Sequence, residues 1–149
     1  MNKMTKIVLF VSVAAIIAAI LVWWEKPRNE AALLLERKTI TQTAEEYLKA
    51  EKEGNWEKVY SFLAPSSVYR KTHTYQEFLK DAAGQAKKIS TYQIVDIYRL
   101  RNNDGKNNFP LVEKFVQVEV DITFKDTGAN STFNYCFTFL KERGVWYKG

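Results

Sequence analysis

Residues 112–148 read VEKFVQVEVDITFKDTGANSTFNYCFTFLKERGVWYK, and this stretch decides the fold. Apolar and polar side chains alternate strictly from Val116 to Phe124, and aromatic side chains recur at every second position from Phe133 to Phe139. A period of two is typical of a β-strand that has one buried face and one wet face. The predicted elements are a strand at 112–125, a hairpin turn at 126–130 and a strand at 132–141.

Two more strands flank this hairpin. After Gly144 the chain continues as a short apolar run, which predicts a last strand at 145–148. Upstream, we predict an earlier strand at 91–101, before the turn-rich stretch 102–108. Four consecutive strands with short connections favour one antiparallel sheet.

Before Ser90 the apolar period is helical. Residues 30–53 carry apolar side chains at helical spacing, and Gly54 is a natural C-terminal stop. Asn55 can cap a second helix, which Pro65 ends, and Thr74 with Glu77 forms a capping box for a third. We predict an α+β domain at 25–149, in which about three helices pack on a curved four-stranded antiparallel sheet.

Residues 7–24 read IVLFVSVAAIIAAILVWW, in which Ser12 is the only polar residue. As a helix this segment is about 27 Å long, close to the hydrocarbon thickness of a bilayer. Trp23 and Trp24 stand where an interfacial aromatic belt belongs. We predict a transmembrane helix at 7–24, which Pro27 separates from the domain. A cleaved signal peptide is the alternative, but large apolar residues follow the last alanines where a cleavage site needs small ones.

Charge indicates how the segment is oriented. Lys3 and Lys6 precede it, and the flank after Trp24 is mixed, so the positive-inside rule predicts a cytoplasmic N-terminus at 1–6 and a domain outside the cytoplasm. These two lysines belong to the 22 basic residues, which leaves 20 against 17 acidic ones in the domain. This surplus is too small to favour a nucleic-acid partner.

Cys136 is the only cysteine, so no disulfide can form within the chain. A domain without disulfides outside the cytoplasm is typical of a bacterial envelope. No metal-ligand spacing, phosphate-binding glycine loop or nucleotide fingerprint occurs, so the sequence predicts no cofactor. His73 has no nearby carboxylate or second histidine, which favours a surface loop residue.

The order of elements resembles the nuclear transport factor 2-like superfamily, a cystatin-like cone in which helices lie in a curved sheet. The motifs that carry the resemblance are TAEEYL at 43–48, GNW at 54–56, YSFL at 60–63 and FTFLKERGVWY at 137–147. Two membrane-tethered groups are similar: the anchored N-terminal domain of bacterial cell-wall transpeptidases and the scaffold subunit of type IV secretion systems. The chain carries no transpeptidase serine motif and no long cytoplasmic tail. The resemblance therefore implies fold and placement more than activity.

Enzymes of this superfamily place an aspartate in the pocket of the cone. The matching position is Asp96, on a strand face with Tyr92, Ile94, Tyr98 and Leu100, where a carboxylate on an apolar face could act as a general base. The alternative is a structural Asp at a sheet edge, or one paired with Arg99 or Arg101.

Aromatic residues are the other candidates. They either line a pocket for a small apolar ligand or pack beneath the helices. The candidate ligand-binding residues are Tyr92, Tyr98, Phe133, Tyr135, Phe137 and Trp146. Phe115 interrupts the polar face of its strand and could contribute to a homodimer or partner surface on the sheet.

The first hypothesis is a non-catalytic, membrane-anchored binding or assembly module of a bacterial envelope. One alternative is a structural subunit of a conjugation or type IV secretion assembly. The other is a small pocket enzyme of the isomerase or cyclase type, with Asp96 as general base.

Overall fold

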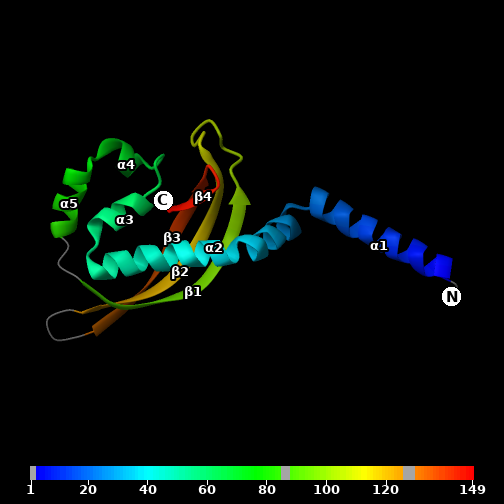
Figure 1. Cartoon of the computed structure of the whole chain (residues 1–149), viewed down its shortest axis with the longest axis horizontal. Coiled ribbons are helices and arrows are strands. Elements are labelled where there is room, and N and C mark those ends of the chain that lie inside the picture. The colour runs from blue at the N-terminus through cyan, green and yellow to red at the C-terminus, as the bar shows by residue number, and fades with distance from the viewer. Residues whose placement is uncertain (1–2, 85–87, 126–129) are drawn as a thin grey trace.

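The computed structural model of this chain describes residues 3–84, 88–125 and 130–149. Within them lie five helices and one antiparallel sheet whose strands follow in the order β1-β2-β3-β4 (Figure 1). The α+β class and the four-stranded antiparallel sheet are therefore confirmed. The elements are α1 (Lys3–Trp23), α2 (Glu25–Glu53), α3 (Trp56–Phe62), α4 (Val68–Thr72), α5 (Tyr75–Ala83), β1 (Lys88–Asn102), β2 (Val112–Lys125), β3 (Asn130–Glu142) and β4 (Val145–Lys148).

The strands follow the alternation of the sequence. β2 and β4 have the predicted bounds, β1 and β3 are longer, and most of the predicted turn at 126–130 lies outside the described residues. Phe133, Tyr135, Phe137 and Phe139 pair with inward-facing residues of β2, so the predicted aromatic face of β3 is confirmed. A two-residue turn of Arg143 and Gly144, both with positive φ, joins β3 to β4.

β1 departs from the expected alternation. Three register shifts interrupt its pairing with β2, and one of them lies between Ile94 and Asp96. As a result Ile94 and Ile97 both pair with buried valines of β2, whereas Asp96 and Tyr98 pair with residues of its polar face. The expectation that Asp96 and Tyr98 share a face with Ile94 is wrong, because the bulge turns the side chains that follow it to the opposite face until the next register shift, after which Leu100 is buried again.

The helices begin and end at recognisable caps. Gly54 ends α2 in the left-handed conformation, Asn55 accepts a hydrogen bond from the Lys58 backbone, and the Thr74–Glu77 capping box opens α5, as predicted. The short helix α4 was not predicted. Its N-terminal cap is the Ser67 side chain, which accepts a hydrogen bond from Arg70.

The break between α1 and α2 lies at Trp24, and the expectation that Pro27 makes it is wrong. Trp24 has an extended backbone, with φ −111° and ψ 107°, while Pro27 lies in the first turn of α2. Proline is tolerated there because an N–H group in the first turn has no helical acceptor. α2 therefore begins five residues before the predicted start at residue 30.

The main core lies between α2 and the inner face of the sheet, which curves around the helix (Figure 1). Trp146, Phe139, Ile40 and Leu48 are its largest fully buried members, together with the valines of β2. A smaller cluster of Ala64, Val112 and Leu140 lies apart from it. Burial of these side chains is the main stabilising contribution, at about 1.5–3 kcal/mol for each large aliphatic or aromatic residue.

α1 extends away from the sheet and from the other helices (Figure 1). Among the described residues, no helix taken singly meets a combined length and hydropathy criterion for a membrane span. The segments Met4–Ile20 and Glu25–Glu53, bent by 96° relative to each other, meet it together by length and composition.

Candidate functional site

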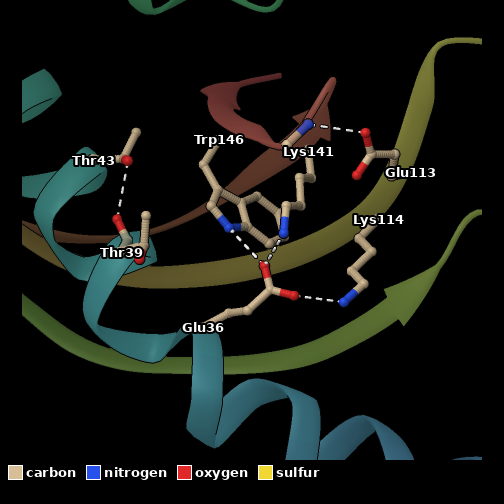
Figure 2. A network of polar contacts seen from close by, with 8 residues as sticks. Glu36, Thr39, Thr43, Glu113, Lys114, Lys141 and Trp146 are labelled. Atoms are coloured by element: carbon tan, nitrogen blue, oxygen red, sulfur yellow. Dashed lines mark hydrogen bonds and ion pairs between the residues drawn. The ribbon is translucent and has the colours of Figure 1, made fainter.

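A carboxylate on α2 joins three strands of the sheet. Glu36 accepts hydrogen bonds from Lys114 Nζ at 2.5 Å, from Lys141 Nζ at 2.7 Å and from the indole Nε1 of Trp146 at 3.1 Å (Figure 2). These donors come from β2, β3 and β4, and the Lys141 ammonium also lies 5.8 Å from the centre of the Trp146 ring. We call Glu36, Lys114, Lys141 and Trp146 the Glu36 clasp.

The clasp is electrostatically favourable although it is largely desolvated. The Glu36 side chain is only 17% exposed, and the two lysines are 24% and 19% exposed. Burial alone would raise the pKa of Glu36, but the hydrogen bonds and charges of both lysines outweigh it and hold this pKa below its ordinary value. An ionised carboxylate with three donors therefore fixes α2 on the sheet.

A second charged group lies where α2 ends and β4 ends. Burial raises the pKa of Glu51 despite the hydrogen bond from Tyr47 and the charge of Lys148. Burial likewise lowers the pKa of Lys148, whose ammonium lies 5.5 Å from the Phe137 ring centre. Both shifts oppose ionisation. The charged forms of Glu51 and Lys148 are therefore less favourable than the charged form of Glu36 in the clasp.

A cleft of about 820 Å³ lies where the start of α2 meets the end of β1. Leu33 and Leu100 provide apolar lining, and Trp24 lies at the junction with α1. The charged lining residues come from both elements and are Glu25, Lys26, Glu30, Arg99 and Arg101. Half of the ten lining residues are thus charged, so this cleft suits a charged ligand better than an apolar one.

We call this cleft the junction cleft, and two of its lining residues are arginines. Arg99 has a positive φ of 53° at the last register shift of β1, where Leu100 points into the core. The guanidinium of Arg99 lies 5.6 Å from the Tyr98 ring centre, and that of Arg101 lies 5.1 Å from the Phe115 ring centre. Within the described part of the chain, neither arginine forms an ion pair.

Asp96 lies at the surface, close to a second and smaller cleft of about 450 Å³. Its side chain is 51% exposed, and Oδ1 accepts hydrogen bonds from Arg37 at 3.3 Å and from the Ile97 backbone at 2.7 Å. The expected partners Arg99 and Arg101 do not pair with it, and Arg37 of α2 is its ion-pair partner instead. Its surroundings lack the apolar enclosure that a general base of the isomerase type needs.

The candidate aromatic residues are spread over four places. Phe133 and Tyr135, near the start of β3, are 44% and 38% exposed. They lie next to the half-buried Phe137. Tyr92 lines the smaller cleft, and its hydroxyl donates to the Glu45 carbonyl. Trp146 is 2% exposed within the core.

Tyr98 lies on the polar face of the sheet, apart from these aromatic residues. Its hydroxyl lies 3.3 Å from Cys136 Sγ, and this exposed thiol donates to Gln117 at 3.1 Å. His73 caps the end of α4 and stacks on Tyr69 at 4.2 Å between ring centres. Of the predicted ligand-binding set, Phe133, Tyr135 and Phe137 form a row of ring contacts along β3.

Phe115 packs against the smaller core cluster, and its part in a partner surface stays a prediction. It is partly buried against Val112 and Leu140, and its ring centre lies 5.8 Å from that of Phe109. The loop between β1 and β2 folds back over it, held by Asn103, whose amide donates to the Phe109 and Val112 carbonyls. Its apolar surface is thus largely covered within the chain.

Neither the Glu36 clasp nor the junction cleft was predicted from the sequence. A signal for the clasp was present: Lys114 is in phase with the buried valines of β2, Lys141 is in phase with Phe139, and Glu36 lies one helical turn before Ile40. Charges at three inward positions, two positive and one negative, indicate a mutual ion pair. The junction cleft has no such signal, because it depends on the bulge at Arg99.

A scan against known protein families finds none that matches this chain, and a search of the curated proteins finds no significant match. Within residues 3–84, 88–125 and 130–149, no three His, Cys, Asp or Glu residues gather as a potential metal site.

Proposed function

We propose that this protein is a non-catalytic module of a bacterial envelope, anchored in the membrane by α1 and carrying a nuclear transport factor 2-like domain outside the cytoplasm. The main support for this proposal is the exposure of the apolar side chains of α1. Every described side chain from Met4 to Trp23 is exposed, and nearly all of them are apolar. A helix with apolar side chains on all sides needs an apolar environment that the domain does not provide.

The length of α1 agrees with insertion in a bilayer. Lys3–Trp23 has 21 residues and is about 31 Å long, which matches the hydrocarbon core of a membrane. Trp23 and Trp24 at its end are among the most exposed aromatic residues, and tryptophan favours the interface between lipid and water.

The domain itself favours binding over catalysis. The general-base hypothesis for Asp96 has no support from its exposed, ion-paired position. The Glu36 clasp fixes α2 on the sheet, and α2 directly follows the anchor, so the domain is held as one rigid body next to the membrane. Such a rigid support suits a module that presents a binding surface at a defined height above lipid.

Alkaline extraction of membranes tests the anchor. We expect the full chain to stay in the membrane fraction after carbonate washing and to be released only by detergent. A matched variant with Ile16→Lys and Ile17→Lys should appear in the aqueous fraction, because charges at the centre of a span oppose insertion. Release of the unaltered chain by carbonate alone would overturn the proposal.

Cys136 provides a direct test of the orientation. It is the single cysteine and is exposed on the polar face of the sheet. A membrane-impermeant maleimide should label it in spheroplasts without lysis, and Cys136→Ser should abolish the label. Labelling that requires lysis would place the domain in the cytoplasm and contradict the proposed orientation.

A further inference from the structure

The charged lining of the junction cleft is complementary to a zwitterionic group. Lys26, Arg99 and Arg101 supply positive charge, and Glu25 and Glu30 supply negative charge. None of these five residues forms an ion pair within the described part of the chain. Charged groups of both signs that share a cleft without pairing are available to a ligand that carries both signs.

The two arginines are suited to phosphate. A guanidinium presents several N–H donors in a fixed plane, which matches the oxygens of a phosphate group. The rings of Tyr98 and Phe115 lie against Arg99 and Arg101 and restrict their side chains. Arg99 is also held in a left-handed backbone conformation that non-glycine residues rarely adopt.

The position of the cleft indicates where its ligand comes from. Trp24, at the end of α1, lines the cleft, and α2 turns away from α1 by 96° at this point. With α1 across the bilayer, α2 runs nearly parallel to the membrane surface. Leu34 and Leu35 are two exposed apolar side chains on this part of α2. The cleft therefore lies at the depth of the lipid headgroups.

We propose that the junction cleft binds the phosphoethanolamine headgroup of a membrane phospholipid. Arg99 and Arg101 bind its phosphate, and Glu25 and Glu30 accept hydrogen bonds from its primary ammonium. A quaternary ammonium has no N–H donor, so the same cleft discriminates against phosphatidylcholine. This inference rests on the proposed membrane anchor.

Native mass spectrometry of the full chain tests the proposal. The chain is purified from mixed micelles that contain equal amounts of phosphatidylethanolamine, phosphatidylcholine and phosphatidylglycerol. We expect phosphatidylethanolamine to be retained about tenfold over phosphatidylcholine, which is the ratio that one hydrogen bond to a charged group provides. Arg99→Gln with Arg101→Gln should reduce retention of phosphatidylethanolamine by a similar factor. Glu25→Gln with Glu30→Gln should remove only the preference over the other two lipids. Equal retention of the three lipids by the unaltered chain would overturn the proposal.

A matched control changes charge outside the cleft. Lys38→Gln with Glu57→Gln removes one charge of each sign at exposed helical positions and should leave the lipid ratio unchanged. If this control alters the ratio as much as the cleft variants do, general surface charge explains the selectivity and the site is refuted. Circular dichroism of each variant identifies those that fail to fold.

Competition separates the headgroup from free phosphate and needs no variant. Soluble phosphoethanolamine should displace the retained lipid at concentrations about tenfold lower than inorganic phosphate does. Equal potency would refute the role of Glu25 and Glu30. Carbonate extraction of membranes that contain the same variants tests the anchor separately, because the arginine variants should stay in the membrane fraction while their lipid ratio changes.

Discussion

The indole N–H of Trp146 donates a hydrogen bond of 3.1 Å to Glu36 Oε2, which links the first part of α2 to the last strand across 110 residues of sequence. The same carboxylate accepts from Lys114 and Lys141. One side chain thus connects the helix to three of the four strands, and its ionisation controls how firmly the helix is held.

In the Glu36→Gln variant, the free energy of unfolding should change less with pH in the acid range than it does in the unaltered chain. The folded-state pKa of Glu36 lies below its ordinary value of 4.5, so its stabilisation is complete above that value and is lost as the pH falls through the folded-state pKa. At pH 7 the substitution should cost roughly 2–4 kcal/mol, because Lys114 and Lys141 lose their counter-charge. The difference from the unaltered chain should shrink below about pH 4.

Thermal unfolding of the full chain in detergent, from pH 7 to pH 3, measures this difference. Glu46→Gln is the control, since Glu46 pairs with Lys58 at an exposed site. A Glu36→Gln variant whose deficit stays constant down to pH 3 would contradict the role of the ionised carboxylate.

Trp146→Phe should destabilise the domain by about 2 kcal/mol, because it removes a hydrogen bond to a charged group and some buried volume. Trp56→Phe is the comparison, since Trp56 also packs against the core but its indole makes no hydrogen bond within the described residues. Equal losses in the two variants, measured by chemical unfolding, would show that ring volume alone matters.

Arg143→Asn should stabilise the domain by about 0.5–1 kcal/mol. Arg143 and Gly144 have φ values of 49° and 78° in the turn between β3 and β4, and asparagine tolerates such values better than arginine does. Arg143→Val should act in the opposite direction, because β-branched residues fit this backbone conformation poorly. The melting temperatures of the two variants check the order.

Asp96→Asn should change stability by less than about 1 kcal/mol, because the Arg37–Asp96 pair is half exposed. The retained lipid ratio should also stay unchanged, since Asp96 does not line the junction cleft. A loss of several kcal/mol in chemical unfolding would assign Asp96 a larger structural part than its contacts indicate.

Much of the fold follows from local patterns. The alternation in β2 set both its bounds and its buried face, and the caps at Gly54, Asn55 and Thr74 located the helix ends. The face that Asp96 occupies could not be predicted, because a bulge depends on how two strands pair and leaves no period in the sequence. The junction cleft was missed for the same reason, since Arg99 and Arg101 meet the start of α2 only in three dimensions.

The irregular pairing of β1 also has a consequence for self-association. An outermost strand exposes backbone N–H and C=O groups on which another chain can assemble into a fibril. β1 is 15 residues long, but no stretch between its register shifts exceeds the four residues from Thr91 to Ile94. Copies crowded side by side, as the proposed membrane anchor would hold them, therefore find no long, straight template for amyloid-like growth.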